Sequence, residues 1–293
     1  MDNGAVPPTL NRWLRRIGLL LALVGCVYVG YRVWRGAPGL HLRWPPADMV
    51  ALALLCGTAG MAALACGWYA LLRAAGGRPG FASAFRAYAI SQPAKYLPGN
   101  VLHFAARHAL GRADGGEHGP LLSAAALEAV SLIGTALLLG GTLASQGLLA
   151  HTGVSRWLPL LIGFGGLSIA AILLARYRGA RCLAWFGAHL AAATGYFLAS
   201  SCAFSLLGGA PYTAPDLVLP VVSIAWVAGF VVVGAPGGIG VREAVMLQLL
   251  APDSSTALVG AVLAFRLTAI AADLCLYAAA WLPPRTPAQD AGT

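Results

Sequence analysis

Two interrupted apolar stretches of this sequence carry ionisable side chains. The first, SQPAKYLPGNVLHFAARH, contains the chain's single lysine, Lys95, followed by His103 and Arg107. The second, VVVGAPGGIGVREAVMLQLLAP, contains Arg242 and Glu243. A break within a helix exposes a helix N-terminus, which together with a nearby cation suits phosphate and other anionic groups. The residue types therefore predict a site for an anionic group near each interruption.

The first interruption is built from residues that stop a helix. Pro98 lacks a backbone donor and pushes Leu97 away from helical geometry, and Gly99 permits a turn. Asn100 is suited to cap the helix that follows. The sequence predicts that one helix ends here and another begins, with a single kinked or interfacial helix as the alternative.

The second interruption matches the first in composition and position. Its turn residues are Pro236, Gly237, Gly238 and Gly240. Pro98 and Pro236 are 138 positions apart, which is near half of the chain. Paired segments interrupted by glycine and proline in the two halves of a membrane protein indicate an inverted internal repeat and a transport site near the midplane.

Further charged residues fall inside apolar segments, namely Glu128, Arg266 and Asp273. A charged side chain at the centre of a membrane helix costs roughly 2.5–3.5 kcal/mol on insertion scales, so such groups normally pair inside the bundle. Arg266 and Asp273 are seven residues apart and share a helix face. We expect each of them to find a partner on another helix.

Two roles fit these charges: structural ion pairs, or binding and proton coupling. The cations expected to neutralise an anionic head group are Lys95, Arg242 and Arg266. The acids expected to fix these cations or to carry a coupling proton are Glu128, Glu243 and Asp273. His103 and Arg107 stand four positions apart on one helix face and extend the basic lining.

The composition is that of an integral membrane protein. Of 293 residues, 59% are hydrophobic and 10% are charged, whereas soluble domains carry about 25% charge. The net charge of +9 does not indicate a nucleic-acid partner, because the arginines stand at the ends of apolar runs, where they set topology. The six cysteines lie within apolar segments without a C-x-x-C pair and are interpreted as small buried hydrophobes.

Apolar windows of about 20 residues predict an all-α, polytopic membrane helix bundle. It has a cytoplasmic segment at 1–16, a transmembrane domain at 17–285 and a short tail at 286–293. Two re-entrant or broken segments are predicted at 81–108 and 235–251. The seven predicted spans are 17–34, 47–72, 120–144, 157–175, 182–207, 216–234 and 256–282, of which we interpret the first as an uncleaved helix.

Arginines indicate the orientation of this bundle. The positive-inside rule places the more basic side, and with it the N-terminus, in the cytoplasm. Because arginines on that side both precede and follow 81–108, this segment must enter the membrane and return, or lie on it. The arginines on the basic side are Arg12, Arg15, Arg16, Arg73, Arg78, Arg86, Arg107, Arg112, Arg176, Arg178 and Arg181, and those opposite are Arg35, Arg43 and Arg156.

The sequence shows no enzyme signature. It lacks G-x-S-x-G and H-E-x-x-H, and GAPGGIGVRE does not have the order of a nucleotide-binding loop. The acids Asp114 and Glu117 lie in a polar loop that we expect to be solvated. No cofactor and no metal site are predicted.

The two interruptions resemble a known family. KYLPGNVLHFAARH is similar to the K-Y-[IL]-P-G-[NS]-[VI]-W-H element of the lysylphosphatidylglycerol synthase transmembrane, or flippase-like, family. PGGIGVREAVM and the later FRLTAIAADL resemble that family's second element and closing helix. The chain departs from the pattern at Leu102, where the family often has tryptophan, and at Ala129, where an arginine is common.

The resemblance implies a protein of the bacterial inner membrane with re-entrant helices, without the synthase domain that follows in bifunctional members. It adds Tyr96, Pro98, Gly99 and Asn100 to the expected site. The implied function is transport, or flipping, of a membrane lipid or lipid-linked anionic molecule between leaflets in cell-envelope biogenesis. The alternatives are a membrane glycosyl- or phosphotransferase acting on a lipid-linked donor, and a scaffold for an envelope-synthesis enzyme.

Overall fold

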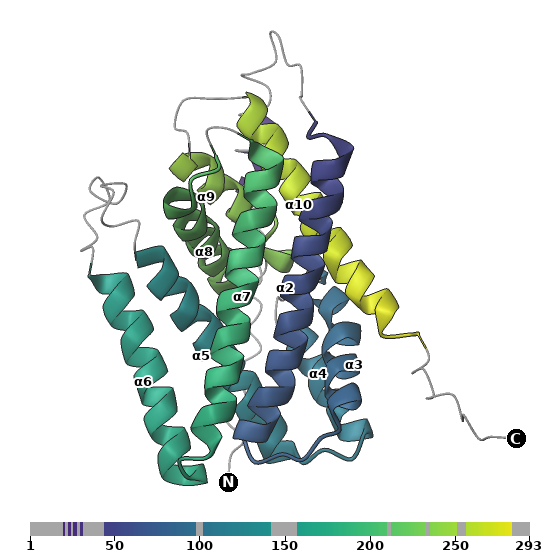
Figure 1. Ribbon diagram of the computed structural model, residues 1–293, viewed down its shortest axis with the longest axis vertical. Coiled ribbons are helices and arrows are strands. Elements are labelled where there is room, and N and C mark those ends of the chain that lie inside the picture. The colour runs from purple at the N-terminus through teal and green to yellow at the C-terminus, as the bar shows by residue number, and fades with distance from the viewer. Residues whose placement is uncertain are drawn as a thin grey trace, which may run out of the picture.

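The computed structural model describes residues 44–97, 102–141, 157–209, 212–232, 235–250 and 256–282, and single positions between 20 and 31. All regular elements in the continuous ranges are helical, which confirms the predicted all-α class (Figure 1). They are α2 (Ala47–Ala74), α3 (Phe81–Ser91), η1 (Gln92–Tyr96), α4 (Leu102–Ala113), α5 (His118–Gly140), α6 (Leu158–Arg178), α7 (Cys182–Gly208), α8 (Pro215–Val231), η4 (Pro236–Gly238), α9 (Val241–Leu250) and α10 (Thr256–Ala279).

Five of these helices, α2, α5, α6, α7 and α10, are long and apolar enough to cross a membrane. They correspond to five of the seven predicted spans, with ends shifted by a few residues. The chain is therefore a multi-pass membrane protein. The predicted first span at 17–34 and the terminal segments 1–16 and 286–293 lie outside the continuously described residues.

The segment 81–108 forms part of a helical hairpin, as the arginine distribution predicted. α3 has 11 residues, which at 1.5 Å per residue covers about half of a 30 Å hydrocarbon core. It tightens into η1, where Pro93 stands near the first position, and α4 returns alongside α3. The two ends of the hairpin meet, since Ser83 Oγ donates to Asp114 Oδ2 at 2.5 Å.

The segment 216–234 does not form the full span that we predicted. α8 has 17 residues, which is the lower limit for a span, and α9 packs back along it. The chain reverses at Gly237 and Gly238, whose φ angles of 56° and 74° favour glycine. Hydropathy alone does not show that the chain turns back after a helix of this length. The second hairpin comprises α8, η4 and α9 rather than 235–251.

The two hairpins enter the bundle from opposite ends (Figure 1). Each is flanked by two long helices, α2 and α5 for the first hairpin and α7 and α10 for the second. This is the arrangement expected of the predicted inverted repeat. The leading helices α2 and α7 pack closely, because a Cβ on Gly60 would stand 3.2 Å from Ala199 Cβ, and small residues let membrane helices approach.

Arginines gather at the end where α2 and α4 finish and α7 begins. The Arg178 guanidinium covers Gly76, Arg73 lies over the Trp185 ring, and Arg86 lies over the Trp281 ring. These contacts place the end of α2 against the end of α6 and the start of α7, and the end of α10 against α3. Arg107 is the exception: we counted it among the topology-setting arginines, but its side chain is 1% exposed and lies inside the bundle.

The hairpin architecture predicts which loops share a membrane face. In a cysteine-free background, we expect Arg78→Cys and Ala113→Cys to react with an impermeant maleimide from one face, because the first hairpin returns between them. Thr213→Cys should react only from the other face and serves as the control. Labelling of positions 78 and 113 from opposite faces would mean that the intervening segment crosses the membrane.

Candidate functional site

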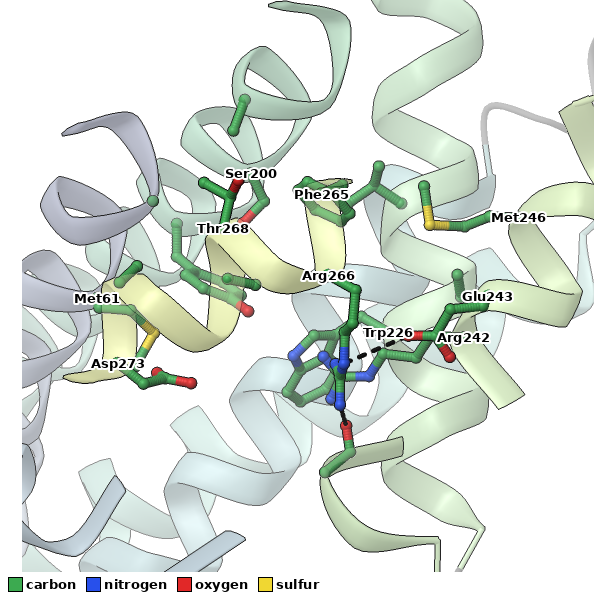
Figure 2. Close-up of a pocket in the computed structure, with 18 of the residues that line it drawn as sticks. Met61, Ser200, Trp226, Arg242, Glu243, Met246, Phe265, Arg266, Thr268 and Asp273 are labelled. Carbon is green, nitrogen blue, oxygen red and sulfur yellow. Dashed lines mark hydrogen bonds and ion pairs between the residues drawn. The ribbon is translucent and has the colours of Figure 1, made fainter. Parts of the chain in front are cut away.

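A central cavity lies where the two hairpins meet (Figure 2). It contains about 830 Å³ of space free of protein atoms, including space open to the surroundings. Its walls come from α2, α7, α8, α9 and α10, and both hairpin tips reach it. The ionisable groups that line it are Lys95, Tyr96, Tyr196, Arg242, Glu243, Arg266 and Asp273.

The hairpin tips contact each other through Tyr96 of η1 and Gly237 of η4. A Cβ on Gly237 would stand 2.8 Å from Tyr96 Cδ1, so the ring packs directly on the backbone of the other tip. Arg266 Nη2 donates to the Gly237 carbonyl at 2.8 Å. The contact requires glycine for two reasons, the positive φ angle and the missing side chain.

Helix α10 holds both tips. Asp273 accepts from Lys95 Nζ at 2.8 Å and from the Tyr96 hydroxyl, both on the first tip. Arg266, two turns earlier, lies 3.3 Å from Glu243 of α9 as well as bonding the second tip. The prediction that Arg266 and Asp273 find partners on other helices is confirmed.

Glu243 has a second contact that bears on the predicted helix N-terminus. The Gly240 amide donates to Glu243 Oε2 at 2.7 Å, which is the arrangement of a capping box at the start of α9. We expected this N-terminus to receive an anionic ligand directly. The Glu243 carboxylate already accepts the hydrogen bond of the Gly240 amide at this N-terminus.

Arg242 is the cation of the central cavity that lacks a carboxylate partner in the described part of the chain. Its guanidinium lies 5.6 Å from the centre of the Trp226 ring, and Gly229 and Gly238 leave room for its stem and Nε. Among described residues its buried Nε has no hydrogen-bond partner. The ring stabilises the cation through its π face and leaves the edge of the guanidinium available.

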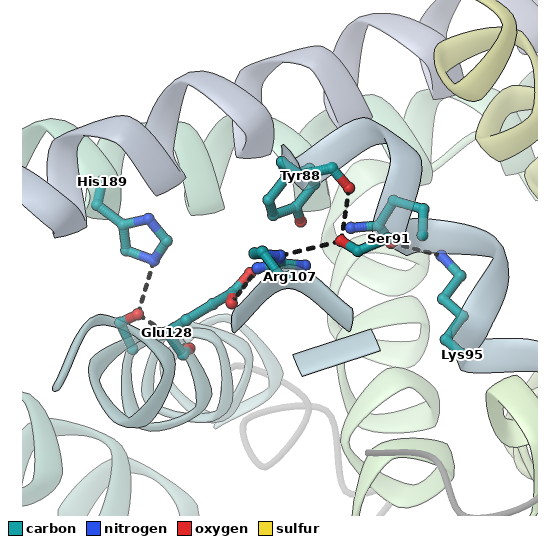
Figure 3. A network of polar contacts seen from close by, with 8 residues as sticks. Tyr88, Ser91, Lys95, Arg107, Glu128 and His189 are labelled. Carbon is teal, nitrogen blue, oxygen red and sulfur yellow. Dashed lines mark hydrogen bonds and ion pairs between the residues drawn. The ribbon is translucent and has the colours of Figure 1, made fainter. Parts of the chain in front are cut away.

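A smaller inner chamber adjoins the central cavity and contains about 500 Å³ of space. Lys95 and Arg242 line both chambers. In the inner one, Arg107 Nη1 lies 2.5 Å from Glu128 Oε2 and Arg107 Nε donates to Ser91 Oγ at 3.1 Å (Figure 3). The guanidinium is also stacked 3.9 Å from the centre of the Tyr88 ring.

His103 faces the inner chamber with 8% of its surface exposed. Its Nδ1 and the Nη2 atom of Arg107 have no hydrogen-bond partner among described residues. Buried polar atoms are normally paired, so both atoms are suited to bind a ligand or ordered water. His189 is also buried, and its Nε2 lies 2.7 Å from Ser131 Oγ.

The structure thus brings most predicted site residues together around two chambers. Lys95 and Tyr96 meet Gly237, Arg266 and Asp273 at the tip contact. Pro98, Gly99 and Asn100 lie outside the described residues. The sequence interpretation missed the Arg107–Glu128 pair and the aromatic partners Trp226 and Tyr88, because no spacing signal connects residues on different helices.

The comparisons with known proteins give no family. The chain matches no family model and no curated protein sequence. Within the described residues, no group of three or more histidine, cysteine, aspartate or glutamate side chains is placed to hold a metal ion. The site is therefore interpreted from its geometry.

Gly237→Ala should weaken the tip contact. An alanine at this φ angle costs about 1–2 kcal/mol, and its Cβ meets the Tyr96 ring, so we expect the free energy of unfolding to fall by about 2–3 kcal/mol. Unfolding in detergent micelles followed by tryptophan fluorescence measures this. Gly165→Ala, which meets no atom within 4 Å, is the control; equal stability of the two variants would contradict the contact.

Glu128→Ala should be costly because it leaves the buried Arg107 charge unpaired. Breaking one side of a buried pair typically lowers stability by about 3–5 kcal/mol. The double variant Arg107→Met with Glu128→Leu should lose less, since it leaves no isolated charge. The same unfolding assay tests both, with the exposed Glu117→Ala as control; a Glu128→Ala loss no larger than that of Glu117→Ala would show that the pair is not buried as described.

Proposed function

We propose that this multi-pass membrane protein moves an anionic lipid or lipid-linked molecule between the two leaflets. The observation that carries the proposal is the meeting of two hairpins, one from each end of the bundle, over a cavity with an arginine that has no carboxylate partner among the described residues. Non-helical backbone at membrane depth is tolerated where it is buried in protein or lines a cavity. Discontinuous helices of this kind mark substrate sites in transporters.

The energetic problem of lipid flipping is the polar head group. Moving a charged group through hydrocarbon is expensive, whereas the acyl chains gain or lose little by turning in the bilayer. In the proposed cycle the head group enters the central cavity and contacts Arg242, while Lys95 and Arg266 exchange carboxylate contacts for contacts with the ligand. The tails remain in the bilayer throughout.

The hairpin tips are the proposed gates. Each tip is only a few residues long and is held by one face of α10. Asp273 of α10 binds the first tip, and Arg266 of α10 binds the second. A head group that competes for Lys95 loosens the first attachment, and one that competes for Arg266 loosens the second. Proton transfer to Asp273 or Glu243 would have the same effect on its partner cation.

The resemblance to the flippase-like family supports the same function. The tip residues Lys95, Tyr96 and Gly237 that meet in space belong to the two sequence elements that carry the resemblance. We place the protein in a bacterial inner membrane, with the arginine-rich end and the N-terminus in the cytoplasm, by the positive-inside rule. Its partners in this proposal are the transported lipid and an envelope-synthesis enzyme that makes or uses it.

The experiment is leaflet-resolved transport of a fluorescent anionic phospholipid in proteoliposomes. The double variant Lys95→Met with Arg242→Gln should lose at least about tenfold in rate, because the head group then has no surplus cation to meet. Arg181→Gln, an exposed arginine at the basic end, is the matched control and should keep the wild-type rate.

Transport that survives the double variant would remove the proposed site. Conversion of a lipid-linked donor to product by the purified wild-type protein would favour the transferase. Absence of both activities, with co-purification of a synthase, would favour the scaffold.

A further inference from the structure

The ion pairs of the two chambers leave a small excess of positive charge. The described residues that line them include four basic side chains, Lys95, Arg107, Arg242 and Arg266, and three carboxylates, Glu128, Glu243 and Asp273. Each carboxylate lies within 3.3 Å of one cation, and the three pairs use Lys95, Arg107 and Arg266. Four cations less three carboxylates leaves one positive charge, on Arg242.

The position of this charge is as informative as its number. Arg242 lines both chambers, so a ligand in either one is adjacent to it. Its face is taken by the Trp226 ring, while its Nε has no acceptor among described residues. Nearby, Arg107 Nη2 lacks an acceptor and His103 Nδ1 lacks a hydrogen-bond partner among described residues. The arrangement offers one net charge and several donors to a single group with two or more acceptor oxygens.

We propose that the transported head group is a singly charged phosphodiester and that the site discriminates against doubly charged phosphomonoesters. This inference rests on the proposed transport function. A phosphodiester carries one negative charge on two non-bridging oxygens, which matches the excess on Arg242. A phosphomonoester brings a second negative charge, and no described residue of either chamber has a second uncompensated cation to meet it. Burying that charge unpaired is unfavourable.

The net charge of the two chambers can be changed while the hydrogen bond from the Gly240 amide to residue 243 is kept. Glu243→Gln raises the excess to two positive charges, and its amide oxygen still accepts from the Gly240 amide. This substitution should therefore shift the preference toward a doubly charged ligand. Arg242→Gln lowers the excess to zero and should abolish the preference for anions altogether.

The test compares two lipids that differ by one methyl group. Proteoliposomes receive fluorescent phosphatidylmethanol or fluorescent phosphatidic acid at about pH 8, where a phosphomonoester is mainly doubly charged. We expect wild-type protein to flip phosphatidylmethanol about tenfold faster or more. Glu243→Gln should reduce or invert this ratio. The exposed Glu117→Gln, which also removes one negative charge, should leave the ratio unchanged.

The outcomes separate this inference from the proposed function. Equal rates for the two lipids, or faster flipping of phosphatidic acid by wild-type protein, overturn the charge preference while transport itself stands. A ratio that Glu243→Gln leaves unchanged also overturns it, because selection would then not depend on the net charge. If neither lipid is flipped, both the charge preference and the proposed transport function are overturned.

A final arm identifies the source of the phosphodiester. Radiolabelled dimethyl phosphate is offered to the same vesicles, and no protein-dependent uptake is expected if the ligand is a lipid head group. Uptake of dimethyl phosphate without flipping of phosphatidylmethanol would overturn the lipid part of the proposed function and, with it, the inference about the transported head group.

Discussion

The contact between the two hairpin tips, held by α10, is the interaction on which the rest of this structure depends. Neither tip is stable alone in hydrocarbon, because each exposes non-helical backbone and carries a cation. The tips pack on each other through Tyr96 and Gly237. Helix α10 binds the first tip through the Asp273 carboxylate and the second through the Arg266 guanidinium. Arg266 and Asp273 are seven residues apart, about 10 Å along the helix. That separation fixes where the tips stand and therefore where the cavity lies.

In each half of the chain an ion pair joins the returning arm of the hairpin to the following helix, and the positions of the acid and the cation are exchanged between the two halves. In the first half, a cation on the returning arm, Arg107 of α4, pairs with an acid on the following helix, Glu128 of α5. In the second half, an acid on the returning arm, Glu243 of α9, pairs with a cation on the following helix, Arg266 of α10. Both pairs attach a half-length arm that is too short to be anchored by lipid contact alone. In both halves the pair is neutral overall, so neither attachment adds net charge to the cavity.

Local chemistry made some of this architecture predictable from the sequence. The residue types around Pro98 and Pro236 predicted interruptions of the helices, and the arginine distribution predicted that 81–108 returns to its side of entry or lies on the membrane. The prediction was wrong for 216–234, since hydropathy measures apolar content and α8 is as apolar as a span. Pairings such as Lys95 with Asp273, 178 positions apart, depend on how helices pack. The sequence predicted that these charges must pair, because burial demands it, but not with which partner.

The choice of residue types explains why the unpaired cation is an arginine. Lys95 carries a compact, strongly hydrated ammonium, which loses much of its hydration inside the bundle and is held by Asp273 together with Gln92. The Arg242 guanidinium is more weakly hydrated and planar, so the Trp226 face stabilises it without neutralising it. Inside a membrane and without a carboxylate partner, an arginine on an aromatic ring is therefore better suited than a lysine to carry a positive charge that binds a ligand.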